Sequence, residues 1–177
     1  MNDFDEALAG IRRGDRKRSR FRPWVMLAVL LGAILFQVYV PLYFSLLQHL
    51  ELPLLVAVYL GVARRNVIEG ALIGAGIGLV QDSLSFQPIG IFGMIKTLLG
   101  YASASLGIRL DTGHPAIRFG LGALAFLCHQ SLYWLVRHVL LGAPSGLDFL
   151  QTVLAALFNG ALAVPLFYLL DRLRKEG

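Results

Sequence analysis

Long apolar runs without a charged residue recur along the chain, and short polar breaks separate them. Trp24–Val40 has 17 residues without a charge, and Phe149–Leu170 has 22. A helix of a soluble protein shows a polar face at every turn, whereas about 20 apolar residues suffice to cross a hydrocarbon core of about 30 Å. The pattern predicts an all-α, polytopic membrane protein with six transmembrane helices, at Trp24–Val40, Leu52–Ala63, Val67–Ser85, Ile89–Ile108, Ala116–Leu140 and Asp148–Leu170.

The second of these helices is shorter than the others. Leu52–Ala63 has 12 residues, which extend about 18 Å at a rise of about 1.5 Å per residue. The preceding segment, Pro41–Glu51, is amphipathic and is expected to lie along the membrane interface. The second helix is therefore either a short span or one that begins inside this interfacial segment.

Basic residues are concentrated on one side of the six-span arrangement. The N-terminal tail, two loops and the C-terminal tail share this side, and together they hold 14 of the 16 Lys and Arg residues. Short segments rich in Lys and Arg stay in the cytoplasm, so both termini are expected to be cytoplasmic. The densest cluster precedes the first span, where it is expected to contact anionic lipid or a partner: Arg12, Arg13, Arg16, Lys17, Arg18, Arg20 and Arg22.

Length and composition fit one membrane domain with two short tails. The chain has 177 residues, of which 56% are hydrophobic. We expect a basic cytoplasmic N-terminal tail over residues 1–23, a six-helix membrane domain over 24–171 and a basic cytoplasmic C-terminal tail over 172–177. The net charge of +5 could suggest nucleic acid, but its position beside the first span favours lipid contact instead.

Two of the predicted helices carry small residues and one charge along a single face. In the third helix, the residues at four-residue intervals are Gly70, Gly74, Gly78 and Asp82. In the fourth helix, the face defined by intervals of three and four residues is formed by Gly93, Lys96, Gly100 and Ala104. Small residues let helix backbones approach closely in lipid, so the two faces are expected to pack together.

An antiparallel hairpin folded about Ile89 would bring these two faces into register. The expected pairs are Asp82 with Lys96, Gly78 with Gly100, and Gly74 with Ala104. A lone charge at the bilayer centre costs at least about 2.5–3.5 kcal/mol, which favours pairing. Three interpretations of Asp82 and Lys96 stay open: a structural ion pair, a polar pocket or partner contact, and proton or ion translocation.

Two further polar residues lie inside the last two predicted spans. His129 and Asn159 are symmetric about Pro144, so they are expected at the same depth and could form an interhelical hydrogen bond. Such a bond contributes about 0.6 kcal/mol on average. This interpretation is preferred over a metal or catalytic role, because no second His and no Cys cluster lies at ligand spacing.

Single residues suggest a bend and a docking face. Pro165 is expected to kink the last helix with the help of Gly160. Ala28 and Gly32 form a small-xxx-small pair in the first helix and are a candidate docking face. The one cysteine, Cys128, lies inside an apolar run and is expected to be a small buried side chain.

The sequence contains none of the common catalytic signatures. It has no G-x-S-x-G, no Walker loop and no HExxH, and no second acid accompanies Asp82 deep in the membrane. The predicted loops leave little room for a soluble catalytic surface. We therefore expect a protein that is not an enzyme and that has no cofactor and no metal, with binding or scaffolding as its role.

The segment from Arg64 to Gly107 resembles the core signature of the bacterial rod shape-determining protein MreD family. That signature has a glycine-spaced helix ending in Asp, a turn with Ser, an Ile-Gly step and a helix with Gly-Tyr. These features fall here on Gly70, Gly74, Gly78, Asp82, Ser85, Gly90, Gly100 and Tyr101. The last predicted helix is similar to that of the family, at Asn159, Gly160 and Pro165. The chain departs from the family at Phe86, where Gly is frequent, and Lys96 is not part of the signature.

The resemblance implies a non-enzymatic inner-membrane subunit of the bacterial cell-elongation (rod) complex. Such a subunit is required for cell shape and organises lateral peptidoglycan synthesis. It works with MreC, MreB, the elongation glycosyltransferase and its transpeptidase, and homodimerisation is left open. The resemblance also implies a fold similar to the substrate-binding subunits of energy-coupling-factor transporters. The alternative function is therefore a transporter subunit that binds a vitamin-like small molecule.

Overall fold

The computed structural model describes residues 23–40, 43, 49–85, 90–142 and 148–175. The described residues form six α-helices and one short π-helical segment, with no strand among them: α2 (Pro23–Tyr39), α3 (Leu52–Arg64), α4 (Val67–Leu84), α5 (Ile91–Arg109), α6 (Pro115–Leu135), η3 (Val136–Leu140) and α7 (Phe149–Lys175). The predicted all-α class is confirmed. Two helices differ by more than two residues from their predicted bounds. Helix α6 ends at Leu135, and the π-helical segment η3 completes the predicted range to Leu140. Helix α7 continues to Lys175 and includes the first part of the expected C-terminal tail.

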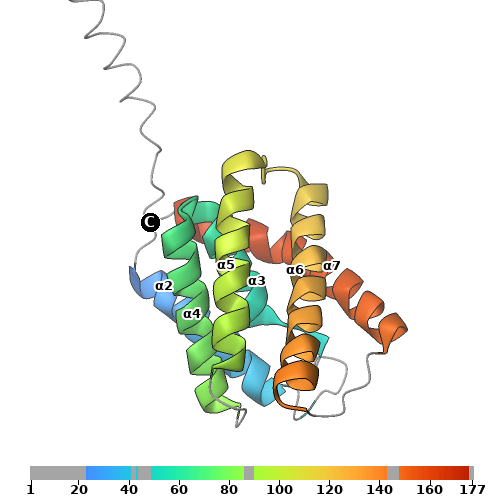
Figure 1. The fold of residues 1–177 in the computed structure, drawn as a ribbon. Helices are drawn as coiled ribbons and strands as arrows, with labels where there is room; N and C mark the ends of the chain where they lie inside the picture. Colours follow the sequence, from blue (N-terminus) through green and yellow to red (C-terminus); the bar gives the residue numbers. More distant parts are fainter. Residues whose placement is uncertain (1–22, 41–42, 44–48, 86–89, 143–147, 176–177) are drawn as a thin grey trace, which may run out of the picture.

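Two pairs of consecutive helices enclose the short helix α3. Helices α4 and α5 form an antiparallel hairpin and lie side by side over most of their length, whereas α7 crosses α6 at an oblique angle (Figure 1). Helix α3 packs against α5 and α4 on one side and contacts α6 and α7 on the other. Helix α2 covers α3 from outside (Figure 1).

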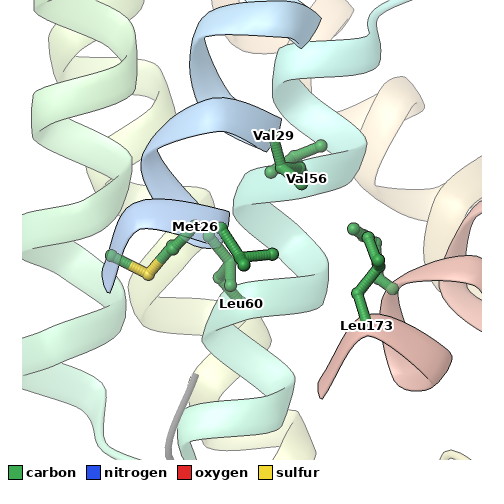
Figure 2. Close-up of a pocket in the computed structure, with 7 residues that line it drawn as sticks. Met26, Val29, Val56, Leu60 and Leu173 are labelled. Carbon is green, nitrogen blue, oxygen red and sulfur yellow. The ribbon is translucent and has the colours of Figure 1, made fainter. Parts of the chain in front are cut away.

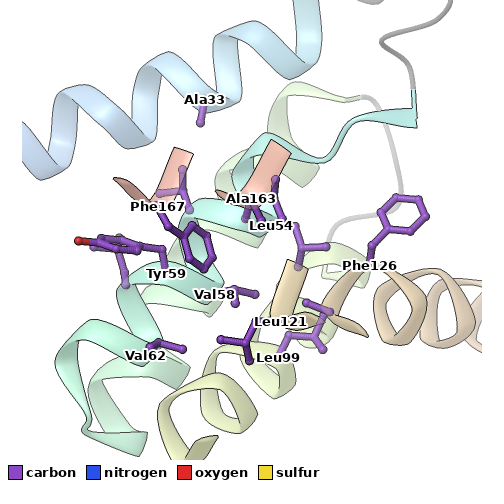
Figure 3. Close-up of a cluster of buried hydrophobic side chains, with 14 of the residues drawn as sticks. Ala33, Leu54, Val58, Tyr59, Val62, Leu99, Leu121, Phe126, Ala163 and Phe167 are labelled. Carbon is purple, nitrogen blue, oxygen red and sulfur yellow. The ribbon is translucent and has the colours of Figure 1, made fainter. Parts of the chain in front are cut away.

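Helix α3 is buried around its whole circumference. Every residue from Pro53 to Val62 is buried, and Leu54 and Leu55 have no exposed surface. Figure 3 shows side chains of four neighbouring helices that belong to the same apolar cluster as those of α3: Ala33 of α2, Leu99 of α5, Leu121 and Phe126 of α6, and Ala163 and Phe167 of α7. A helix that is apolar all round belongs in the interior, which explains why its sequence shows no polar face.

Large apolar side chains cover the outside of the bundle. Among the described residues, four helices are long and apolar enough to cross a membrane, at Val67–Leu84, Ile91–Arg109, Pro115–Val139 and Phe149–Arg174. Each of them exposes large apolar residues, such as Leu72, Leu98, Leu124 and Leu154. The other two helices are shorter, because α2 has 17 residues and α3 has 13. Apolar patches of this extent are typical of a surface in contact with lipid.

Helix α2 packs with one face and leaves the other face open. Between α2, α3 and α7 only a small apolar gap of about 10 Å³ remains, lined by Met26, Val56 and Leu173 among others (Figure 2). The predicted docking residues Ala28 and Gly32 are both exposed, and a Cβ atom added at Gly32 would meet nothing within 4 Å. The predicted basic cluster before this helix lies outside the described residues.

Two sequence expectations about the bundle surface differ from the structure. Cys128 is exposed and not buried, because it lies on the outward face of α6, where apolar side chains face lipid. Most of the expected interfacial segment Pro41–Glu51 lies outside the described residues. Its described end turns inward instead, since Leu50 is 3% exposed and the Glu51 side chain is 14% exposed.

Candidate functional site

The first part of the site is the close contact between α4 and α5. The two backbones approach so closely at Gly70, Gly74 and Gly78 that a Cβ atom added at any of them would overlap the α5 backbone. At Gly70, the added atom would lie 2.5 Å from the carbonyl oxygen of Gly100, whereas real Cβ contacts essentially never fall below 3.0 Å. The predicted small residues of α5 face this contact: Gly93, Gly100 and Ala104.

The register of this hairpin differs from the predicted one. Gly70 lies against Gly100, and Gly78 lies against Phe92 in the first turn of α5. The sequence-based register placed Gly78 against Gly100 and is therefore wrong by about two helical turns. The hairpin is not symmetric about Ile89, because the end of α4 extends beyond the first turn of α5.

This asymmetry puts Asp82 at the amino-terminal end of α5. One carboxylate oxygen accepts hydrogen bonds from the backbone N–H groups of Gly90 at 2.9 Å and Gly93 at 3.0 Å, and the other accepts from Phe92 at 3.0 Å. The first N–H groups of a helix have no partner within the helix and carry partial positive charge. Gly90 has no side chain to cap them, so Asp82 of the neighbouring helix acts as the cap.

Lys96 lies in the centre of the bundle with no exposed surface. Its ammonium group donates a hydrogen bond to Oε1 of Gln81 at 2.5 Å and lies 3.5 Å from Oε2 of Glu51. It also lies 4.7 Å from the centre of the Phe92 ring, within the range of a cation–π interaction. Three helices therefore contribute to the surroundings of one buried cation. Lys96 belongs to α5, Gln81 belongs to α4, and Glu51 directly precedes α3.

The direct ion pair expected between Asp82 and Lys96 does not form. The carboxylate of Asp82 is occupied by three backbone amides, and the carboxylate within ion-pair distance of Lys96 is that of Glu51. Both expected residues are buried, with Asp82 1% and Lys96 0% exposed. Two members of this polar centre were thus predicted from the sequence, but the partner predicted for each of them was wrong.

Asn159 of α7 fixes the segment that leads into α3. Its side-chain oxygen accepts a hydrogen bond from the backbone N–H of Glu51 at 2.9 Å. Its amide nitrogen donates to the carbonyl oxygens of His49 at 2.7 Å and Ala155 at 2.9 Å. Asn159 has no exposed surface, and it supplies polar partners for the backbone of the segment before α3, as buried backbone requires.

His129 lies beside this centre but does not bond to Asn159. Its ring stacks with those of Phe92, at 5.8 Å between centres, and Tyr133, at 6.4 Å. Both ring nitrogens are buried without a hydrogen-bond partner among the described residues. The expected His129–Asn159 hydrogen bond is wrong, because symmetry about Pro144 ignores the different lengths and directions of α6 and α7 (Figure 1).

The contact between α6 and α7 also relies on small residues. A Cβ atom added at Gly160 would lie 2.9 Å from the carbonyl oxygen of Phe119, and one added at Gly122 would lie 2.5 Å from the side chain of Ala163. Gly160 therefore serves the α6–α7 contact. Pro165 lies inside the continuous helix α7, and the kink expected there stays a prediction.

A second polar cluster connects the second half of α3, the beginning of α6 and the end of α7. Asp171 accepts a hydrogen bond from Tyr59 at 2.8 Å and forms an ion pair with Arg118. Arg118 also donates to the carbonyl oxygen of Thr112 at 2.8 Å and lies over the ring of Tyr168 at 4.1 Å. Sequence reasoning counted Arg118 only as a loop charge and did not identify this cluster.

Two members of the central site, Glu51 and Gln81, were not predicted from the sequence. Glu51 ends a segment with alternating polar residues, so it was placed at the membrane interface. Gln81 directly precedes Asp82 and lies one position off the glycine face. A signal for Glu51 was present, because a buried Lys requires a compensating anion and Asp82 was not the only acid at the outer ends of the spans.

A polar cavity of about 150 Å³ lies between α6, α7 and the segment before α3. It is lined by His49, Phe126, Gln130, Asp148, Gln151, Thr152 and Ala155. A separate apolar groove of about 470 Å³ runs along the outside of the α4–α5 hairpin, lined by Ala75, Leu79, Gly90, Gly93, Met94, Thr97 and Leu98. Within the part of the chain that the structure describes, no cluster of three or more His, Cys, Asp or Glu residues could hold a metal ion.

Four apolar helices of membrane-spanning length, arranged around a buried polar centre, define a multi-pass helical membrane protein. The sequence matches the family model of the rod shape-determining protein MreD over residues 18–174, nearly the whole chain. The protein therefore belongs to the MreD family, whose members determine cell shape. Comparison with curated proteins and with solved structures gives no significant match.

Proposed function

We propose that this protein is a non-enzymatic integral subunit of the bacterial cell-elongation complex, required for rod shape. The observation that carries this proposal is the match to the MreD family over residues 18–174. In this role the protein contacts MreC and, with MreB and the elongation glycosyltransferase and transpeptidase, organises lateral peptidoglycan synthesis. It lies in the inner membrane with six spans and with both termini in the cytoplasm, where the basic residues of its tails face anionic lipid.

The internal geometry supports a scaffolding role. The buried bonds of Glu51, Asp82, Lys96 and Asn159 connect α3, α4, α5 and α7 to one another. Such bonds specify one arrangement of helices, since apolar contacts alone do not distinguish a neighbouring helix from lipid. A rigid bundle of this kind holds its outer faces in a fixed relative position, as a subunit that aligns partners in a membrane requires.

The outer groove of α4 and α5 is the surface that we propose for a partner helix. Small residues at its floor, including Ala75 and Gly93, and larger apolar residues at its rim form a concave surface of about 470 Å³. Small residues permit close approach of a second transmembrane helix. MreC, the bitopic partner that the family resemblance implies, supplies one transmembrane helix for such a groove.

The transporter alternative receives less support. Sites for drug-sized small molecules usually have volumes of about 300–1,000 Å³ and combine apolar walls with a few polar groups. The polar cavity of this protein has a volume of about 150 Å³, and the larger groove has an almost entirely apolar lining. The polar cavity is too small to enclose a vitamin with several rings, and the groove lacks the polar groups that such a molecule needs, so we retain the scaffolding role.

Depletion in a rod-shaped bacterial host tests this function. Cells depleted of the protein are expected to become round, and expression of the full chain is expected to restore rods. Ala75→Phe, which fills the groove, should reduce both the recovery of rods and the co-purification of MreC, whereas Ile68→Phe, at an exposed position of the same helix, should not. Unchanged shape after depletion, together with lost uptake of a vitamin, would favour the transporter alternative.

A further inference from the structure

The polar cavity between α6 and α7 has the features of a small binding site. Its volume of about 150 Å³ far exceeds the roughly 10–15 Å³ that one water molecule requires. Of the seven described residues that line it, five are polar: His49, Gln130, Asp148, Gln151 and Thr152. The cavity belongs neither to the Lys96 centre nor to the outer groove, and the proposed function does not use it.

Part of the cavity wall is held in place by hydrogen bonds. The side chains of Gln151 and His49 are 2.6 Å apart at their nitrogen atoms. One carboxylate oxygen of Asp148 accepts from the backbone N–H of Gln151 at 3.1 Å, and the Asp148 carbonyl accepts from the hydroxyl of Thr152 at 2.8 Å. These bonds fix Asp148 at the beginning of α7 and connect the wall to the segment that leads into α3.

Other polar atoms of the wall remain available for a ligand. The side-chain amide of Gln130 makes no hydrogen bond to any described residue, and the second carboxylate oxygen of Asp148 makes none either. The amide of Gln130 offers two donors and an acceptor, and the carboxylate offers acceptors only. Phe126 and Ala155 provide an apolar floor between these polar groups.

The chemistry of this lining selects among ligand classes. Among the described residues that line the cavity, none is Lys or Arg. The one His, His49, faces the side-chain nitrogen of Gln151, which only donates, so the His49 ring accepts there as a neutral imidazole and does not compensate the charge of a phosphate or carboxylate. An ammonium group could bind Asp148 but, as a donor only, would leave the Gln130 donors unmatched. A hydroxyl group both donates and accepts, and the C–H surfaces of a polyhydroxyl ring suit the floor formed by Phe126.

We propose that this cavity binds an uncharged, hydroxyl-rich group of the carbohydrate type. The same chemistry is offered by a free sugar and by the headgroup of a glycolipid, and a membrane protein has access to both. The proposal is independent of the role in cell shape, because it rests on the lining of the cavity and not on the family match.

Saturation-transfer NMR on the purified full-length protein tests this proposal. The protein must be held in a detergent without a sugar headgroup, since a glycoside detergent would compete for the cavity. Methyl β-glucoside is the free probe. The lipid arm uses nanodiscs that contain monoglucosyl diacylglycerol, with phosphatidylcholine nanodiscs as the comparison. Transfer to the glucose ring in solution identifies a free sugar as a ligand, and transfer only in the glycolipid nanodiscs identifies a lipid headgroup.

Matched variants separate the cavity from the rest of the surface. Gln130→Leu and Gln151→Leu should each weaken glucose binding at least about tenfold, because each removes a hydrogen-bonding side chain from the wall. Ser131→Ala, next to Gln130 but outside the cavity, should leave binding unchanged. The test on the wild-type protein stands even if a variant does not fold. Absence of transfer to glucose in both arms, equal binding by both leucine variants, or equally strong binding of a choline headgroup would overturn the proposal.

Discussion

The contact between α4 and α5 allows a sharp test, because α4 carries both contacting and free glycines. At Gly74, an added Cβ atom would overlap the backbone carbonyl of Lys96. At Gly76, two residues further along the same helix, an added Cβ atom would meet nothing within 4 Å. Gly74→Ala and Gly76→Ala therefore make the same chemical change in the same helix and differ only in the space around the new methyl group.

The expected magnitude follows from two opposing contributions. Replacing Gly by Ala inside a helix favours the helix by about 0.8–1.0 kcal/mol, and this contribution is shared by both variants. At Gly74 alone the helices must move apart, since the colliding atom belongs to the backbone and cannot rotate away. Overpacking of this kind costs typically about 1–3 kcal/mol. Gly74→Ala should thus be less stable than Gly76→Ala by about 1–3 kcal/mol.

Equilibrium unfolding of both variants in mixed micelles, followed by far-ultraviolet circular dichroism, measures this difference. Gly78→Ala serves as a second contacting variant, because an added Cβ atom there would overlap the backbone of Phe92. We expect Gly76→Ala to be at least as stable as the wild type. Gly74→Ala and Gly78→Ala should both be less stable than Gly76→Ala. If the variants at positions 74 and 78 unfold at the same point as that at 76, the two helices are not in contact through this face.

Three further predictions concern the polar centre. Lys96→Met should destabilise the protein by about 3–5 kcal/mol, because it leaves the carboxylate of Glu51 buried without a countercharge; adding Glu51→Gln should recover most of the loss, and a double variant as unstable as the single one would contradict the pair. Asp82→Ala should cost at least about 2 kcal/mol of unfolding free energy and Asp82→Asn less, since Asn keeps one acceptor oxygen for the α5 amides. Asn159→Leu should speed hydrogen–deuterium exchange at the backbone N–H of Glu51, and unchanged protection there would show that another group holds this segment.

Helix positions followed from the sequence because their causes are local. Apolar runs of span length placed the helices within a few residues. The structure shows short-range signals at two of their ends, a proline at the beginning of α6 and an Asn cap before α4, and the Asn cap was not part of the prediction. Asn66 accepts hydrogen bonds from the N–H groups of Ile68 and Glu69. Arg65 has a positive φ of 52° that ends α3 directly before this cap. Such signals lie within four residues of the boundary that they determine.

The register of the glycine hairpin did not follow, because it depends on the geometry of the connection. Gly90 has a φ of 107°, a left-handed conformation that favours glycine, and the N–H of this residue donates to Asp82. The chain therefore enters α5 directly beside the end of α4. A symmetric fold about Ile89 assumes that both helices end at equal distances from the turn, which sequence spacing alone does not determine.

The sequence predicts which kind of partner a buried polar residue needs, but it does not predict which residue is that partner. The requirement that Lys96 find an anion is a property of the residue and its apolar surroundings, and the structure meets it with Glu51. Which acid supplies the charge depends on α3 being so short that the residue before it lies inside the bundle. The length of α3 was predicted, but its consequence for Glu51 was not, because the preceding segment resembled an interfacial one.

The short helix and the polar centre depend on each other physically. A 13-residue helix extends about 20 Å, so its amino-terminal end and the segment before it lie inside the bundle, where backbone groups need polar partners. Asn159 supplies them for the backbone, and Lys96 balances the charge of Glu51. Because these bonds fix α3 against α5 and α7 from within, the exposed faces of the described helices can be apolar, as contact with lipid requires.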